Sequence, residues 1–191
     1  YEKDKNTPMI LNLEGDTKLN QIINLRLISL IEKNNKIIID NVTVDKKLNI
    51  LDFNNVEIDY LDNDDIINKF KIVKKKNDYF LSGISFNGDY LITGLLNDNE
   101  NKVKFQKDNF NLNIKLSKFF LDKNNSLENF EGNLLLNNQE ILDGHLTGFF
   151  SKNEKFSFSI KSNKDERITT LFLDRAKPLV NRYEFVKGVS G

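Results

Sequence analysis

The sequence predicts a mainly β fold in which an antiparallel meander forms one curved sheet, accompanied by two or three short helices. Polar and apolar residues alternate from the middle of the chain almost to its end, as they do when successive side chains point to opposite faces of a strand. The links between these segments are short and rich in Asn, Asp and Lys. Such links favour antiparallel pairing, because parallel neighbours need long crossovers.

The alternation is clearest in two segments. In residues 110–116 every even position is apolar and every odd position is Asn or Lys, and residues 155–161 repeat the pattern with Phe156, Phe158 and Ile160 on one side. Weaker strands are predicted over residues 36–44, 48–60, 69–73, 79–86, 102–106, 127–136, 140–150 and 168–173. The apolar pattern in 48–60 is interrupted between Ile50 and Val56, which indicates a bulge or a turn there.

Three segments fit helices better. Apolar residues in 19–31 have helical spacing behind the candidate caps Asp16 and Thr17, although Leu25 and Leu27 also permit a strand. A short helix is predicted over 90–96 after Asp89, and another from Asp174 to about residue 183. The longest apolar runs are three residues, far short of the roughly 18 needed for a membrane-spanning helix.

The length of 191 residues suits one large domain or two small ones. We predict one unit over 1–191: an N-terminal strand and helix region in 1–35, antiparallel strands in 36–173 and a short helix in 174–187. Because the chain starts at Tyr1 and ends abruptly at Gly191, we expect it to be a piece of a longer protein. The 28 basic and 28 acidic residues balance, so we expect no nucleic-acid partner.

Most catalytic chemistry is excluded by counting, since the chain has no cysteine and one histidine. His145 has polar alternation neighbours and no evident nucleophile, so we expect a solvent-facing strand residue. Residues 62–65 resemble the start of a calcium loop, but Ile66 takes the next ligand position and Ile67 replaces the required glycine. We therefore expect no catalytic residues, no metal, no cofactor and no enzymatic activity.

Something must cover the apolar faces of so many strands. A closed sandwich or barrel would fill its own interior with these side chains. A sheet curved into an open trough would instead offer an apolar lining to lipid chains. The periodicity of the sequence does not separate these two interpretations.

The last part of the chain contains a series of strand, turn and short-helix motifs in segments 86–96, 110–119, 130–136, 143–148, 156–160 and 168–191. Through these segments, from about residue 80 onward, the chain resembles the C-terminal region of bacterial AsmA-like envelope proteins. In the last of these, the comparable positions are Asp174, Ala176, Leu179, Tyr183, Phe185, Lys187, Gly188 and Gly191.

The resemblance implies an open β-groove, similar to a folded taco, in the periplasm of a diderm bacterium. It also implies an anchor in the inner membrane outside these residues and transport of phospholipid between the inner and outer membranes. Our candidates for the lipid-binding lining are Leu112, Ile114, Leu116, Phe156, Phe158 and Ile160. The alternative is a structural or assembly module, a closed β-sandwich without lipid, that contacts envelope assembly proteins through an edge strand.

Overall fold

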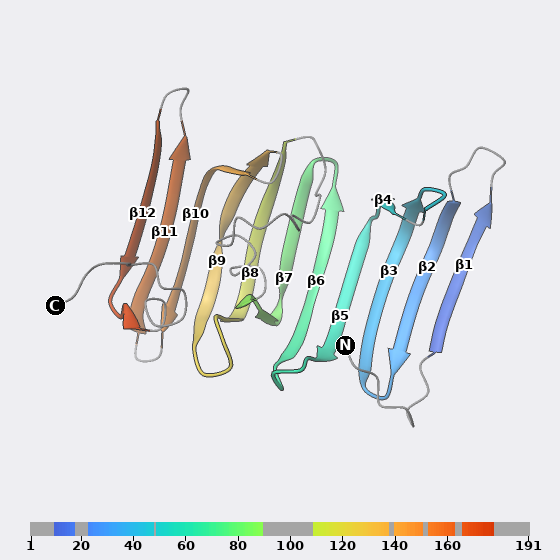
Figure 1. Ribbon diagram of the computed structural model, residues 1–191, viewed down its shortest axis with the longest axis horizontal. Coiled ribbons are helices and arrows are strands. Elements are labelled where there is room, and N and C mark those ends of the chain that lie inside the picture. The colour runs from blue at the N-terminus through green and yellow to red at the C-terminus, as the bar shows by residue number, and fades with distance from the viewer. Residues whose placement is uncertain are drawn as a thin grey trace.

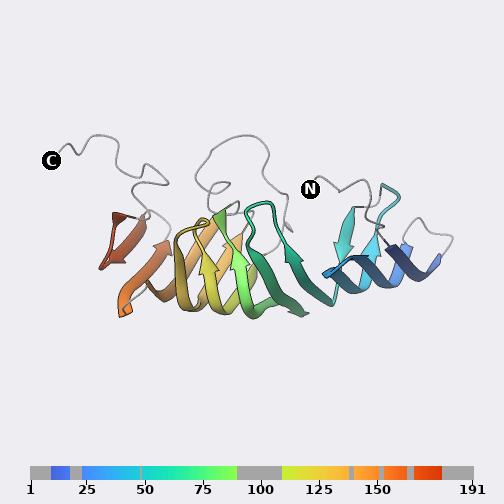
Figure 2. The ribbon, with the colours of Figure 1, turned by 90° about the horizontal axis from the view of Figure 1, so that it is seen from below.

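The computed structural model describes residues 10–17, 23–47, 49–89, 109–137, 140–150, 153–162 and 166–177. Within them the chain forms one open sheet of 12 strands, in the order β1-β2-β3-β5-β6-β7-β8-β9-β10-β11-β12, with β4 paired to β3 beside this path. The strands follow one another across a single layer (Figure 1), and the layer bends so that one face is hollow (Figure 2). The predicted mainly β, curved open sheet is therefore confirmed.

The strand bounds show how closely the alternation locates the elements. The strands are β1 Ile10–Thr17, β2 Ile23–Glu32, β3 Asn35–Val44, β4 Ile50–Asp52, β5 Asn55–Leu61, β6 Ile67–Lys75, β7 Asp78–Asn87, β8 Phe110–Phe120, β9 Ser126–Asn137, β10 Glu140–Phe150, β11 Glu154–Ser162 and β12 Arg167–Leu173. The interruption predicted between Ile50 and Val56 is the break between β4 and β5.

One pair of neighbours departs from the expected antiparallel meander. Strands β7 and β8 run parallel, whereas the other neighbours along the path are antiparallel. Residues 88–109 join them, and this link exceeds the dozen or so residues that a parallel crossover needs. The strand predicted over 102–106 falls in this link, outside the described residues.

The helix predicted over 19–31 is wrong where the structure describes it, because Ile23–Glu32 is strand β2. Ile28 and Leu30 point to one face of the sheet and Leu27 and Ile31 to the other, so apolar residues occur on both faces of this strand. Without clean alternation, their spacing imitates a helix. The helix predicted from Asp174 does not begin there, because residues 174–176 are not helical. The rest of that helix after residue 177, and the helix predicted over 90–96, lie outside the described residues.

The hydrophobic core lies on one face of β6 to β11. Residues directly opposite each other on neighbouring strands share a face, so the register assigns each strand residue to one side. The core face, which we call the concave face, carries Phe70, Leu81, Ile114, Leu116, Phe119, Leu121, Leu127, Phe130, Leu134, Phe150 and Phe156. The opposite, convex face carries polar pairs such as Lys71 with Glu57 and Lys115 with Glu131.

Two lines of irregular backbone cross the sheet. The first runs from the register shift at Glu14/Gly15 in β1 to Asn41 in β3, whose φ is 51°. The second runs from the shift at Lys69/Phe70 in β6, through Asn129 in β9 with φ 48°, to the shift at Thr147/Phe149 in β10. Asparagine tolerates this left-handed backbone better than most residues, and bulges bend strands. These lines therefore help to curve the sheet.

Replacing Asn129 tests this account. Asn129→Val places a β-branched residue in the left-handed region, which costs about 1–2 kcal/mol of unfolding free energy, whereas Asn129→Gly is tolerated. Urea unfolding followed by circular dichroism measures both. Asn133→Val, at an ordinary position of β9, is the matched control, and equal losses at positions 129 and 133 would refute a special role for the bend.

Candidate functional site

The candidate site is an apolar band on the concave face, built by cross-strand pairing. On the N-terminal side, Leu30 lies opposite Ile37, and Ile37 lies opposite Ile58. A second row runs beside it, with Ile39 opposite both Ile28 and Val56. Each apolar residue therefore has an apolar neighbour on the next strand, so the rows stay on one face.

The band continues across the whole sheet. It reaches β1 through Leu11 opposite Leu30 and Leu13 opposite Ile28. In the other direction it passes through β6, β7 and β8, and it reaches β12 where Phe158 lies opposite Leu171. Ten strand spacings of about 4.8 Å make the band about 48 Å long. It is long and narrow, with its long axis perpendicular to the strands.

The half of the band over β6 to β11 is a packed aromatic core. Phenylalanine rings touch in series, from Phe70 against Phe86 at 5.0 Å between centroids to Phe119 stacked on Phe130 at 4.3 Å. The series continues to Phe156, and Phe150 packs edge-on against that ring. Interlocked rings that are this well buried leave little space for another molecule.

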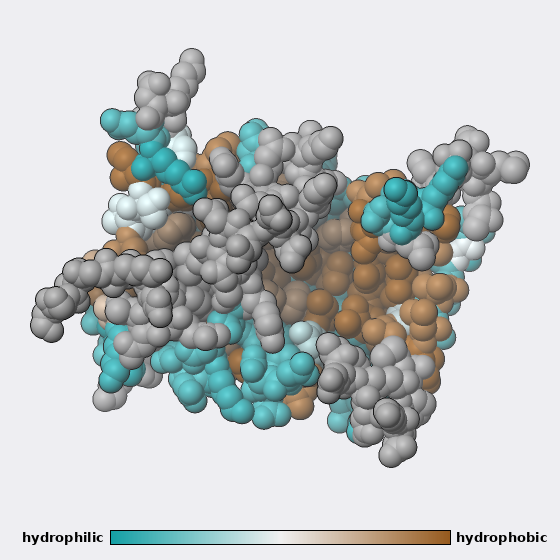
Figure 3. Space-filling model, viewed as in Figure 1, coloured by the Kyte–Doolittle hydropathy of each residue, from teal (hydrophilic) through white to brown (hydrophobic). Residues whose placement is uncertain are grey.

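The half over β1 to β5 is aliphatic and more accessible. In the rows described above, the members on β2, β3 and β5 are half-buried: Ile28, Leu30, Ile37, Ile39, Val56 and Ile58. Further along β3, Val42 and Val44 are buried. Leu11 and Leu13 on β1 are 58% and 57% exposed. Figure 3 looks onto this face and shows apolar residues gathered over β2, β3 and β5. This aliphatic half is the accessible part of the band.

A buried polar cluster borders the band at one end of β6 and β7. Asp62 accepts hydrogen bonds from the backbone N–H groups of Asp64 and Ile66 at 3.0 and 2.9 Å. Its other oxygen accepts from the side-chain amides of Asn68 and Asn87 at 2.9 and 2.7 Å. Burial raises the pKa of Asp62, but the hydrogen bonds outweigh it and hold that pKa below its usual range. The cluster keeps a charged carboxylate at this rim.

The opposite end of β6 carries an ion pair. The Nζ of Lys74 contacts the carboxylate of Asp52 and lies 5.8 Å from the centroid of the Tyr79 ring. Burial lowers the pKa of Lys74, but the hydrogen bond to Asp52 and the adjacent Tyr79 outweigh it and hold that pKa above its ordinary value. Lys74 is two residues beyond Ile72, so the apolar band has a polar border at both ends of β6.

The six predicted lining residues all lie on the concave face. Leu116 and Ile160 are 2% and 3% exposed, Ile114 and Phe156 are each 9% exposed, and Leu112 and Phe158 are half-buried beside the core. The structure thus brings them together, but mostly inside packed core. The accessible residues on β2, β3 and β5 were missed, because β2 was read as a helix and the run 37–39 does not alternate.

The residues considered above for catalysis or metal binding have ordinary structural surroundings. His145 is exposed on the convex face, between its cross-strand neighbours Asn133 and Ser159. Asp62 is occupied by the hydrogen bonds described above. Within the described ranges, no group of three or more histidine or acidic residues is placed to hold a metal ion, and no helix is long and apolar enough to cross a membrane.

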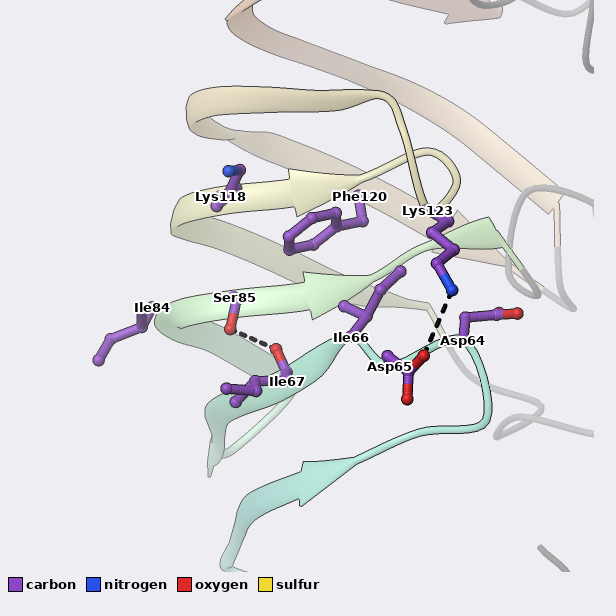
Figure 4. Close-up of a pocket in the computed structure, with 9 residues that line it drawn as sticks. All are labelled: Asp64, Asp65, Ile66, Ile67, Ile84, Ser85, Lys118, Phe120 and Lys123. Atoms are coloured by element: carbon purple, nitrogen blue, oxygen red, sulfur yellow. Dashed lines mark hydrogen bonds and ion pairs between the residues drawn. The ribbon is translucent and has the colours of Figure 1, made fainter.

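A shallow hollow of about 440 Å³ lies at the end of β6, β7 and β8 (Figure 4). Ile67, Ile84 and Phe120 form its apolar part, while Lys123 pairs with Asp65 at 3.3 Å across its rim. Phe120 follows the core residue Phe119 along the strand, so alternation places the hollow on the convex face. It is therefore separate from the apolar band.

Comparison of the chain with protein-family models, with curated proteins and with solved structures found no match.

Asp62→Asn tests the rim cluster. The variant removes a charged acceptor from two buried amides, so we expect the unfolding free energy at pH 7 to fall by about 1–3 kcal/mol. Because the folded pKa of Asp62 is lowered, its stabilisation is complete above the unfolded value of about 3.9 and is lost as the pH falls through the folded pKa. Urea midpoints of variant and wild type should therefore converge below about pH 3.9.

Asp65→Asn is the control, since its ion pair with Lys123 is exposed and worth about 0–1 kcal/mol. A difference between Asp62→Asn and wild type that stays constant down to pH 3 would contradict the assignment.

Proposed function

We propose that this protein is a non-enzymatic binding module whose concave apolar face holds the acyl chains of phospholipids. The observation that carries the proposal is the aliphatic half of the band, where Ile28, Leu30, Ile37, Ile39, Val56 and Ile58 stand half-buried on an open single-layer sheet. An elongated apolar ligand fits a surface that is long and narrow.

The energetics suit an acyl chain. Each methylene removed from water contributes about 0.8 kcal/mol, so ten methylenes laid on the band contribute roughly 8 kcal/mol before the cost of ordering the chain. An acyl chain has no polar atoms, so the wall needs no hydrogen-bonding groups at its centre. The charged groups at the rim, Asp62 and the Lys74–Asp52 pair, leave polar surroundings for a headgroup.

The side-chain types favour lipid over a protein partner. Protein interfaces are enriched in aromatic residues, Met and Arg at their cores. The accessible rows over β2, β3 and β5 consist of Ile, Leu and Val instead. Such a wall provides broad apolar contact without directional groups, as a mobile chain requires.

The wider setting is part of the proposal, and its support is the resemblance of segments within residues 86–191 to AsmA-like proteins. In that setting the chain is a segment of a periplasmic protein attached to the inner membrane, and its face conducts phospholipid between the inner and outer membranes. Nothing in such an apolar face determines the direction in which phospholipid moves. A lipid gradient or another envelope protein would have to do so.

A second candidate function is a structural or assembly module of the envelope. Its exposed edge strands favour this reading, because unpaired strand edges recruit other strands. The closed β-sandwich expected for it is wrong, since the sheet is open and the described residues form one layer. Lipid binding therefore remains the better account of the concave face.

Substitutions at neighbouring positions of β3 test lipid binding. Ile39 faces the band, whereas Ile38 faces the convex side opposite Ser29 and Glu57. An amide in apolar contact costs about 1–3 kcal/mol, so Ile39→Asn should lower bound phospholipid roughly tenfold. Ile38→Asn should leave it unchanged. Native mass spectrometry after incubation with phosphatidylethanolamine and phosphatidylglycerol vesicles measures the bound lipid.

Circular dichroism must show both variants folded. Ile114→Asn is less suitable, because Ile114 is buried in the core and the variant would unfold the sheet. Absence of phospholipid from the folded wild type, or equal loss in both β3 variants, would sink the proposal.

A further inference from the structure

The sheet ends in two strands that each have one described neighbour. Strand β1 pairs with β2 alone, and β12 pairs with β11 alone. Both carry exposed apolar side chains: Ile10 54%, Leu11 58%, Leu13 57%, Ile168 59%, Leu171 42% and Phe172 52%. An edge that is long and apolar is a template for pairing with another strand.

We propose that β12 of one copy of this chain pairs antiparallel with β1 of a second copy, so that the sheet and its concave band continue from copy to copy. The direction, the hydrogen-bonding phase and the charge of the two edges carry this inference. It does not depend on lipid binding.

The strand directions fit. Along the path from β1 to β12 every step reverses the strand direction except the parallel step from β7 to β8. With that single exception, β12 runs opposite to β1. A second copy placed beside the first without turning over therefore presents its β1 antiparallel to β12.

The hydrogen-bonding phase of the two edges also fits. The Asp174 N–H donates to the Lys155 carbonyl at 3.0 Å, so the alternation of an antiparallel ladder turns the backbone groups of Thr169 and Leu171 outward. On the other edge, a two-residue turn joins Glu32 to Asn35, so these two residues form a hydrogen-bonded pair between β2 and β3. Following the alternation along β2 and across to β1, the backbone N–H and C=O groups of Leu11 and Leu13 point away from β2, toward the open edge.

These outward-turned residues have their side chains on the concave face. Leu171 lies opposite Phe158, and Leu13 lies opposite Ile28. Residues that face each other in a hydrogen-bonded pair share a face. Pairing Leu171 with Leu13 and Leu173 with Leu11 therefore joins the two concave bands without inverting either sheet.

Charge selects this pairing over the symmetric ones. Strand β1 contains Glu14 and Asp16 but no basic residue, and β12 contains Arg167 but no acidic residue. Two β1 strands would join edges with a net charge of −2 each, and two β12 strands would join edges with a net charge of +1 each. In the register above, Arg167 comes opposite Thr17 and points to the concave face, whereas Glu14 and Asp16 point to the convex face. The attraction is therefore between the net charges of the two edges and not within one ion pair. Because the two edges differ, each added copy leaves another open edge.

Complementation between blocked edges tests the proposal. Proline at an outward-turned position removes a donor from the free edge without breaking the internal ladder. Thr169→Pro blocks β12 and leaves β1 intact, whereas Leu13→Pro blocks β1 and leaves β12 intact. In sedimentation velocity, the wild-type chain should grow beyond a dimer with concentration. Each variant alone should be a monomer, and their equimolar mixture should form a dimer.

Each other result counts against the proposal. Dimers of one variant alone would indicate a symmetric or different contact, and a mixture that stays monomeric would rule out the pairing. Arg167→Glu provides a test that does not require proline, with folding checked by circular dichroism. It should weaken wild-type association, and adding Glu14→Lys and Asp16→Lys to the same chain should restore it. Failure of that rescue would overturn the assignment.

Discussion

The structure depends on one constraint: the register at each strand boundary must keep the apolar residues of the concave face on the same side of the sheet. The described residues form a single layer, so none of them provides a second layer that could stabilise the sheet after an error of register. A slip of one residue would turn a strand's apolar set to the convex face. The pairs from Leu13 and Ile28 at one end to Phe158 and Leu171 at the other keep that set on a single face. The core and the accessible band both follow from this register.

Much of the fold could be predicted, because alternation is a local property. The patterns in 110–116 and 155–161 became β8 and β11, and the interruption after Ile50 became the break before β5. Strand β2 was mistaken for a helix because both of its faces are apolar. The parallel step from β7 to β8 also escaped prediction, because it depends on a long link and on partners distant in sequence.

For the candidate site, too, local sequence patterns predict which face is apolar, but the burial of that face depends on strands distant in sequence. Alternation identified an apolar face correctly, and all six candidate residues lie on it. Alternation does not reveal how deeply a face is buried, since that depends on neighbouring strands. The phenylalanine series that fills the C-terminal half comes from six different strands, β6 to β11. The accessible half is aliphatic and has no comparable local signature, because Ile37, Ile38 and Ile39 form an unbroken run.

A single-layer sheet also differs from a globular core in how it comes apart. Apart from weak contacts, each strand touches only its neighbours in the sheet. Stability then resembles a sum of nearest-neighbour terms, as in repeat proteins. Opening can begin at β1 or β12 and move inward one strand at a time, until it meets the interlocked rings around Phe119 and Phe130. The edge strands should therefore open more readily than the central strands, and their amide protons should exchange with solvent first.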